Sequence, residues 1–549
     1  MDGSRHQEAL CRRGLVAGIT LLLAACGSSS VTPDPPVGST PPPSVGSVNV
    51  LTYHNDNART GANLQETVLT PANVNAADFG RINFFPVDGK VDAQPLYVSA
   101  LGINGTTRNV LYVATEHDSM YAFDADSGAV LWRVSLLGAG ETPSDNRGCG
   151  QVTPEIGITA TPVIDPTAGP HGTLFVVAMS NDGAGNYYQR LHALDLATGA
   201  ERPGSPVTVQ ASYPGTGDDS VKGRVIFAPA QYKERPGLLL LNGVVYTFWS
   251  SHCDHRPYTG WIIGYNESTL TRSRVLDITP NGSEGSIWAS GAGPAADNVG
   301  NIYFLAGNGT FDTTLDANGF PIHHDYGNAF LKISTANHRL TVADYFTMDN
   351  TVAESSADED FGSGGVLVLP DFTDAHGQVR RLAVGAGKDR NIYVVNRDNM
   401  GKFSPTANHI WQELPQGLGG PEFGMSAYFN GTLYYGAADD VIRAFSIRQA
   451  KLSATPVSET TNRFPYPGAT PSLSADGSSN AILWAVDNSN PAVLYAYDAG
   501  NLAHELYDSN QVGSRDRFGP GNKFITPTIA NGKVFVGTTD GVAVFGLLH

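Results

Sequence analysis

The chain has 549 residues, a formal net charge of −18, 62 glycines and 34 prolines. This acidic balance, without a basic stripe, excludes a nucleic acid as partner, because the protein would repel a phosphate backbone. The glycine and proline content is high for a helical protein, so we expect an all-β chain of many short strands joined by tight turns.

The N-terminus carries the features of a secretory signal peptide over residues 1–25. Two arginines precede an apolar run from Gly14 to Ala25 that is too short to span a bilayer. The string Leu-Ala-Ala-Cys ending at Cys26 resembles a bacterial lipobox, so we expect Cys26 to be lipidated and to become the first mature residue. An ordinary signal peptide with a chance cysteine is the alternative. Gly27 in place of an aspartate favours the outer membrane, on its periplasmic or surface face.

Residues 26–50 are rich in serine, proline and glycine, which predicts an extended tether that cannot pack. Beyond this tether only two cysteines remain, Cys149 and Cys253. Export places them in a compartment that permits disulfides, so we predict that they pair; two free buried thiols are the alternative. No cysteine and histidine spacing typical of a structural zinc site occurs.

Residues 51–549 contain a recurring pattern, a short apolar strand that often begins just after a proline. Six such starts carry the proline, and the first three intervals between them are 67, 67 and 65 residues long. Two further starts without proline, near Gly365 and Ala427, fill the longest gap and bring the number of copies to eight. The six prolines are Pro95, Pro162, Pro229, Pro294, Pro471 and Pro527.

Each copy continues with aromatic and β-branched strands that alternate with Asp, Asn and Gly turns. A period of this length, with about four strands per copy, is typical of a propeller. We therefore predict an eight-bladed, all-antiparallel β-propeller with four strands per blade. The last copy lacks an outer strand, while FGRINFFPVDG at residues 79–89 is a strand without its own sheet, so we expect this N-terminal strand to complete the last blade.

The string MYAFDADSGAVLW, residues 120–132, resembles the pyrroloquinoline-quinone (PQQ) repeat of quinoprotein alcohol dehydrogenases and of the lipoprotein scaffold of the outer-membrane barrel assembly machinery. Weaker copies are LHALDLATG and LYAYDAGN. In this repeat the Asp and Gly close a turn and the Trp packs between blades. From Tyr53 onward the chain also looks like a group of exported bacterial propellers, with YHNDNARTGANLQE as one of its recognisable strings.

The resemblance implies PQQ and calcium as possible cofactors. A quinoprotein alcohol dehydrogenase would be expected to show two adjacent cysteines, a Trp platform and Glu, Asn and Asp ligands for calcium. No two cysteines of this chain are adjacent, no haem-attachment CxxCH is present, and a catalytic Asp cannot be assigned residue by residue. The repeat therefore indicates the fold more strongly than the cofactor. Our leading expectation is that the chain binds no cofactor.

In a propeller, the loops that lead into the innermost strands and the loops between second and third strands emerge on one face, around the mouth of the axial channel. We call the former lead-in loops. They supply Glu155, Glu284, Asp360, Glu422 and Arg515, and the second-to-third loops supply His117, His252, Asp254, His255, Asp312, Asp325, Lys388 and Asp389.

We predict Glu284, His255 and His252 as candidate catalytic groups, since crowding around one axis raises carboxyl pKa values and histidine serves as a base near neutral pH. Glu155, Asp254, Asp312, Asp325, Lys388, Glu422 and Arg515 are candidate ligand-binding residues. Two histidines three apart could also bind a metal, whose identity the sequence leaves unknown. The structural alternative is that the acids cap backbone amides, Lys388 forms a salt bridge and a disulfide holds the histidine loop.

The leading hypothesis is an exported lipoprotein that acts as a binding or scaffold module through an acidic axial mouth. Its partner would be an unknown ligand or exported protein, with membrane contact through the lipid anchor. One alternative is a hydrolase or lyase acting on a polar exogenous substrate such as a glycan. Another is a PQQ-dependent dehydrogenase. No GxSxG, Walker or dinucleotide motif is present, so nucleophilic hydrolysis has no support.

Overall fold

The computed structural model describes residues 48–548. The predicted signal peptide, Cys26 and almost all of the predicted tether lie outside these residues. Within residues 48–548, no helix is long and apolar enough to cross a membrane. The only α-helix there is α1 (Thr351–Ala357).

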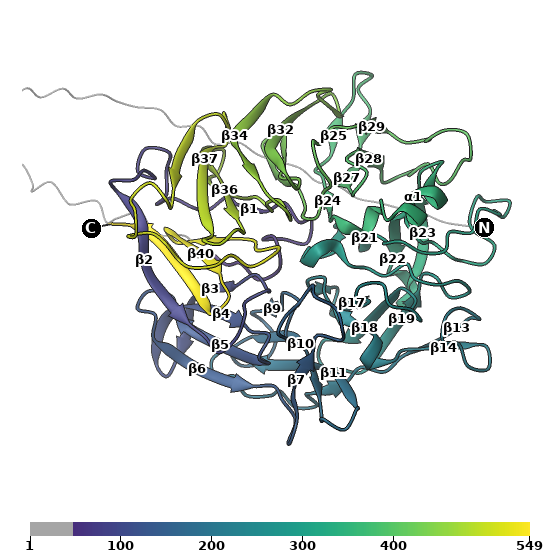
Figure 1. Ribbon diagram of the computed structural model, residues 1–549, viewed down its shortest axis with the longest axis horizontal. Coiled ribbons are helices and arrows are strands. Elements are labelled where there is room, and N and C mark those ends of the chain that lie inside the picture. The colour runs from purple at the N-terminus through teal and green to yellow at the C-terminus, as the bar shows by residue number, and fades with distance from the viewer. Residues whose placement is uncertain (1–47, 549) are drawn as a thin grey trace, which may run out of the picture. The chain divides into compact units, whose positions relative to one another are not determined.

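The described residues form eight principal sheets, which follow one another around a centre in chain order (Figure 1). This confirms the predicted eight-bladed all-β propeller. Blades 1 to 4 contain β3 (Leu96–Ile103), β4 (Thr106–Ala114), β5 (Ser119–Asp124) and β6 (Val130–Ser135); β9 (Val163–Asp165), β10 (Thr173–Asn181), β11 (Tyr187–Asp195) and β12 (Val207–Thr208); β16 (Leu239–Leu241), β17 (Val244–Ser250), β18 (Trp261–Asn266) and β19 (Arg272–Asp277); and β20 (Ala295–Ala296), β21 (Asn301–Leu305), β22 (Phe330–Ser334) and β23 (Thr341–Phe346).

The remaining blades are built in the same way from four antiparallel strands each. Blades 5 to 8 contain β24 (Val366–Val368), β27 (Leu382–Ala386), β28 (Ile392–Asn396) and β29 (Gln412–Leu414); β30 (Ala427–Phe429), β31 (Thr432–Tyr435), β32 (Asp440–Arg448) and β34 (Ser458–Phe464); β35 (Ser472–Asp476), β36 (Ser479–Asp487), β37 (Val493–Asp498) and β38 (Glu505–Asp508); and β39 (Thr528–Ala530), β40 (Lys533–Gly537), β41 (Gly541–Leu547) and β2 (Phe79–Pro86).

Short accessory elements decorate this frame. They are β1 (Ala62–Asn63), β7 (Thr142–Asp145), β8 (Glu155–Ile156), β13 (Ser212–Pro214), β14 (Arg224–Ile226), β15 (Lys233–Glu234), β25 (Phe372–Thr373), β26 (Val379–Arg380) and β33 (Lys451–Leu452), with 3₁₀ turns η1 (Pro229–Gln231), η2 (Ala289–Gly291), η3 (Ala336–His338) and η4 (Phe361–Ser363).

The last blade joins the two ends of the folded part, as the sequence predicted. Strand β2 pairs antiparallel with β41 from Phe79 opposite Leu547 to Pro86 opposite Gly541. Phe79 is fully buried, and its ring packs against Tyr507 of blade 7. Ring closure thus removes the open sheet edge that an unpaired β41 would present.

The middle strands depart from the predicted alternation of apolar and polar residues. Every residue of β5 and β17 is buried, whereas the outer strand β6 alternates between exposed and covered positions. The reason is that a middle strand is covered on both faces by the neighbouring blades, as in a parallel sheet between helices. Alternation therefore survives chiefly at the outer strands.

The repeat motif acts as predicted. The Asp124 carboxylate accepts the Ser127 amide at 2.9 Å, and Gly128 takes a φ of +78°, which closes the turn. Trp132 donates its indole N–H to the Leu196 carbonyl of blade 2 at 2.9 Å, so the tryptophan links adjacent blades.

One blade start differs from the sequence prediction. Pro229 lies in η1, and the innermost strand of blade 3 is β16, which begins at Leu239. Between them, β15 makes a second, separate pairing with β17. The proline does not mark the start of the innermost strand here, because the lead-in loop of blade 3 contains its own short strand.

Residues 48–66 fill one side of the axial channel. The sequence did not predict this position. This segment, the channel segment, forms a hydrogen bond with the innermost strand of every blade, and it meets the blades in chain order. The eight contacts are Val50 with Tyr97, Leu51 with Ile164, Asn57 with Leu240 and with Ala296, Ala58 with Val368, Thr60 with Tyr428, Gly61 with Leu473, and Asn63 with Ile529. Val48 and Val50, placed in the predicted tether, are buried parts of the folded unit.

Arg59 anchors the channel segment from inside the channel. Its guanidinium donates to the Pro294 carbonyl at 2.9 Å and to the Leu238 carbonyl at 3.3 Å, and it also bonds Thr52 at 2.7 Å. The side chain is fully buried. Gly293 lies against it, and a Cβ there would come within 2.9 Å of the guanidinium.

Candidate functional site

The lead-in loops and the second-to-third loops do meet on one face, which we call the mouth. Their glycines make this contact possible. A Cβ on Gly157 would lie 2.3 Å from the Glu116 carbonyl oxygen, and a Cβ on Gly362 would lie 2.3 Å from the Gly307 amide. The acidic-x-Gly motif therefore lets the lead-in loops of blades 2 and 5 press against a second-to-third turn of the preceding blade.

A cavity of about 320 Å³ opens at the mouth. Two of its aspartates surround one lysine: Lys388 Nζ lies 2.5 Å from Asp358 and 2.8 Å from Asp360. We call Asp254, Asp358 and Asp360 the mouth aspartates. The cavity lining consists of Gln151, Asp254, Ser286, Trp288, Gly307, Asn308, Asp358, Asp360, Lys388, Phe423 and Tyr466.

Aromatic side chains from four lead-in loops gather beside this cavity. Trp288 packs edge-on against Phe524 at 5.6 Å and Phe423 at 6.3 Å, and Phe423 packs edge-on against Tyr466 at 5.0 Å between ring centroids. Tyr466 is 47% exposed. We call these four the mouth aromatic residues. Arg235 lies over one face of Phe524 and Lys523 over one face of Tyr466, so a ligand at the rim would meet ring edges and the remaining faces.

The predicted disulfide is confirmed. Cys149 and Cys253 are bonded, with their Cα atoms 5.6 Å apart. The bond joins the lead-in loop of blade 2 to the second-to-third loop of blade 3. Asp254 follows directly and accepts hydrogen bonds from Tyr258 at 2.8 Å and Ser251 at 3.1 Å, so the disulfide helps fix this aspartate at the cavity.

The two candidate catalytic histidines have different surroundings. His252 is 3% exposed and bonds the Tyr232 carbonyl through Nε2 at 3.2 Å. Burial, followed by the charge of Lys233, lowers the pKa of His252 to about 3, so this ring is neutral at pH 7. His255 is exposed to solvent. Glu284 is half-buried, and burial raises the pKa of its carboxyl group.

Two predicted ligand-binding acids make internal contacts. Glu155 Oε1 lies 2.8 Å from His117 Nδ1. Glu422 is fully buried, and its Oε1 accepts the Gly424 amide at 3.0 Å. Burial raises the pKa of Glu422 to about 8. Both contacts match the structural alternative, in which lead-in acids cap amides or link blades.

The insertion of blade 4 holds Asp312 and Asp325 away from the mouth cavity. Asp312 bonds His323 at 3.0 Å, and Asp325 accepts the Asn281 amide at 2.9 Å. Burial raises the pKa of Asp325 to about 6. These residues line the junction between blades 3 and 4.

Arg515 does not lie where the sequence placed it. Its guanidinium pairs with Asp516 at 2.6 Å and donates to the Phe79 carbonyl at 2.9 Å, so it joins the outer region of blades 7 and 8. Its lead-in loop is long, and this part of it lies beside outer strands. The mouth prediction for Arg515 is therefore corrected.

Below the mouth, the channel contains charged residues that sequence reasoning missed. Lys233 is 1% exposed, and burial followed by the Arg235 charge lowers its pKa to about 7. Asp92 and Glu116 face it, and burial followed by Asp92 raises the pKa of Glu116 well above its usual value. Arg235 lies over the Phe524 ring at 5.1 Å. The string KERPG reads as a solvated turn, and only the convergence of blades on one axis brings these charges together.

Within residues 48–548, no group of three or more His, Cys, Asp or Glu side chains is arranged to hold a metal ion. A paired-histidine metal site is also not formed, because His252 points inward while His255 is exposed.

A family model described as "Outer membrane protein assembly factor BamB" matches residues 57–156. No curated protein matches the chain. Among solved structures, quinohemoprotein alcohol dehydrogenase from Comamonas testosteroni matches with 14% identity and a TM-score of 0.57, covering 91% of this chain and 80% of that one. A europium-containing methanol dehydrogenase matches with 13% identity and a TM-score of 0.57, covering 90% of each chain.

A third match is the quinohemoprotein alcohol dehydrogenase ADHIIG from Pseudomonas putida HK5, with 13% identity, a TM-score of 0.56, and coverage of 91% of this chain and 80% of that one. The family match supports a PQQ-like repeat β-propeller, and the structural matches show the propeller fold. At such identities the likeness concerns the fold, and function has to be argued from the site.

Proposed function

We propose that the chain is a binding module whose axial mouth takes a small ligand with a cationic or hydroxylated group. The lining of the mouth cavity carries this proposal. The three mouth aspartates outnumber Lys388, which already pairs with two of them. Carboxylates accept hydrogen bonds from hydroxyl and ammonium groups, and aromatic rings attract cations.

The quinone alternative receives less support from the same lining. PQQ is a tricarboxylate, and its charges would meet the mouth aspartates while Lys388 is already engaged. The described residues hold no group of three His, Cys, Asp or Glu side chains suited to a metal ion, and no two cysteines are adjacent. The residues present therefore do not fit the quinone, although a tryptophan, Trp288, does lie at the mouth.

The hydrolase or lyase alternative also has less support. His252 is buried and neutral, with one ring nitrogen bonded to a carbonyl, so it is poorly placed to take a substrate proton. His255 and Glu284 stay predictions, and no contact between them supports an acid and base pair.

We propose export and anchoring through lipidated Cys26, on the strength of the lipobox-like string alone. The scaffold role would then be exercised at a membrane surface, in the outer membrane. A Cys26→Ser variant should move the protein from the membrane fraction to the soluble exported fraction. Retention of the variant in the membrane fraction would contradict the anchor.

The mouth proposal is tested by titrating the tryptophan fluorescence of the full chain with choline, glucose and gluconate. We expect a saturable change with choline or glucose, since they carry a cation or neutral hydroxyl groups, and a weaker response to gluconate. A Trp288→Phe variant identifies the reporting ring. A stronger response to gluconate, or no saturable change with any of the three, would refute the proposal.

Tyr466→Ala provides the matched variant, because Tyr466 lines the cavity yet is 47% exposed. Its removal should weaken choline binding by about three- to tenfold, the usual worth of one cation–π contact. Val457→Ala is the control, because Val457 is 58% exposed and does not line the cavity. Unchanged affinity in Tyr466→Ala would remove the aromatic part of the proposal.

A further inference from the structure

The face opposite the mouth holds a larger cavity than the mouth itself. Its volume is about 810 Å³, against about 320 Å³ for the mouth cavity. We call it the groove. Its floor is the channel segment, and its walls are the first-to-second strand turns of blades 4 to 7. Its lining includes Leu64, Val299, Asp371, Arg381, Arg397 and Phe429.

The groove leaves apolar side chains in water. Val299 is 77% exposed and Leu64 is 49% exposed, while Tyr428 and Phe429 form part of the wall between them. Ala58 and Ala62 of the channel segment add an apolar floor. Neighbouring apolar residues that stay exposed on a folded protein commonly mark a binding surface.

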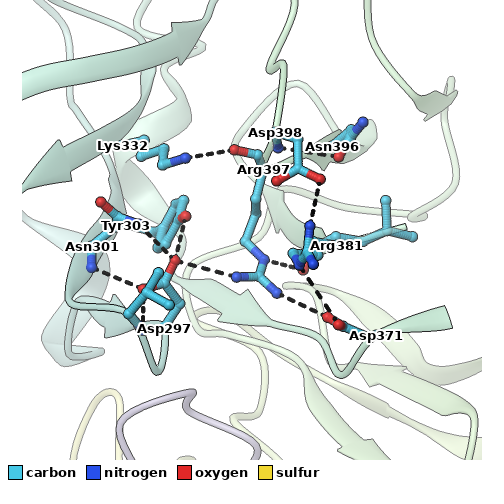
Figure 2. Close-up of polar contacts among 11 residues, drawn as sticks. Asp297, Asn301, Tyr303, Lys332, Asp371, Arg381, Asn396, Arg397 and Asp398 are labelled. Atoms are coloured by element: carbon cyan, nitrogen blue, oxygen red, sulfur yellow. Dashed lines mark hydrogen bonds and ion pairs between the residues drawn. The ribbon is translucent and has the colours of Figure 1, made fainter. Parts of the chain in front are cut away.

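A network of charges fixes one wall of the groove (Figure 2). Arg397 is 7% exposed in its side chain and lies 3.3 Å from Asp297 of blade 4 and 3.6 Å from Asp371 of blade 5. Asp297 also accepts the Val299 amide at 3.1 Å, so the arginine indirectly holds the turn that presents Val299. These contacts fix the shape of this wall of the groove.

The charges of the rim favour a basic occupant. Arg381, the exposed cation of the lining, is already shared by Asp371 at 3.7 Å and Asp398 at 3.2 Å. Both aspartates are about half exposed, at 52% and 50%. No cation of the groove lining is therefore free for an acidic group, and the chain as a whole carries a net charge of −18.

We propose that the groove binds an extended peptide segment with apolar side chains and at least one basic residue, supplied by another protein. The lining crosses turns of four consecutive blades, a layout that suits an elongated chain. Asn298, Asn430 and Ser478 stand along it and offer hydrogen bonds to a peptide backbone. A second copy of this acidic chain is disfavoured by charge, since both copies carry the same excess of carboxylates.

The test uses the full chain and two labelled eight-residue peptides. Each peptide has three leucines spaced by serine or glycine; one carries lysine at both ends and the other glutamate. We expect fluorescence anisotropy to show saturable binding of the lysine peptide and at least about tenfold weaker binding of the glutamate peptide. Equal binding of the two peptides, or none of either, would overturn the proposal.

Variants locate the peptide on the groove. Val299→Lys and Leu64→Lys should each weaken the lysine peptide by about tenfold, because each replaces an apolar contact by a repelling charge. Val221→Lys is the matched control, since Val221 is 57% exposed and lies outside the groove. Asp371→Asn should reduce the ratio between the affinity for the lysine peptide and the affinity for the glutamate peptide. Unchanged affinity in both groove variants would refute the site.

Three further measurements distinguish the proposed peptide from other occupants and the groove from the mouth. If dodecylammonium displaces the lysine peptide and has the higher affinity of the two, the groove binds a small amphiphile. If the chain self-associates and Val299→Lys abolishes this self-association, the groove binds a second copy. Either result overturns the proposal. Choline at a saturating concentration for the mouth should leave peptide affinity unchanged, which keeps this result independent of the proposed mouth function.

Discussion

The two faces of this propeller are built by the same eight blades but differ in loop length and in side-chain chemistry. At the mouth, lead-in loops and second-to-third loops bring together aspartates, one lysine and four aromatic rings, and a disulfide joins one loop of each kind. On the opposite face the turns are shorter, and the channel segment bonds the innermost strand of every blade. The charged and aromatic side chains are thus concentrated on the face with long loops. The contacts by which the channel segment links all eight blades belong to the face with short turns.

The largest effect should come from the buried anchor of the channel segment. Arg59→Met removes the donors to Pro294, Leu238 and Thr52, and leaves those acceptors buried without partners. We expect the free energy of unfolding to fall by about 4 kcal/mol in a denaturant titration. Arg448→Met, at an exposed position, should change it by less than about 0.5 kcal/mol. A similar small loss in both variants would show that the channel segment does not stabilise the ring.

A second effect should come from the covalent link at the mouth. The double variant Cys149→Ser with Cys253→Ser opens a bond between residues 104 positions apart, and we expect a loss of about 3 kcal/mol in unfolding free energy. The choline affinity should fall as well, because Asp254 loses its fixed neighbour. Peptide binding at the groove should stay unchanged. A loss at the groove equal to that at the mouth would mean that the two faces are not independent.

The smallest effect concerns pH. Burial raises the pKa of Glu422 from 4.5 to about 8, so the folded state keeps its proton where the unfolded state releases it. The stability linked to this proton is present below pH about 4.5 and is lost as pH rises from there to about 8. Glu422→Gln keeps the acceptor for the Gly424 amide without the titration. The variant should be more stable than the wild type by about 1–2 kcal/mol at pH 8, with a smaller difference at pH 5. The same difference at both pH values would contradict the pKa.

Much of the frame was predictable because strands repeat in sequence. Seven of the eight predicted starts directly precede an innermost strand, and the closing role of β2 followed from a missing partner for β41. The disulfide followed from two cysteines in an export context. These predictions needed only local patterns and one rule about sheet edges.

The remaining features depend on how the blades converge, which no local pattern expresses. The channel segment has little strand periodicity, because it bonds most blades at one residue and forms only the two-residue strand β1 against blade 7. Lys233 and Arg235 lie within three residues of Pro236 in a string that looks like an exposed turn, yet both are buried. Arg515 was misplaced for the opposite reason, since a long lead-in loop also passes the outer strands.

The path of residues 48–66 imposes an order on biogenesis. This stretch is synthesised before any blade, but Asn63 needs the carbonyl of Ile529, and β2 needs β41, both near the end of translation. Val50 and Leu51 can pair with blades 1 and 2 early, but Asn63 and β2 must wait for the last blade, and contacts of such long sequence separation form slowly. A nascent chain that stops before Ile529 and β41 are synthesised would leave Asn63 and β2 without these partners.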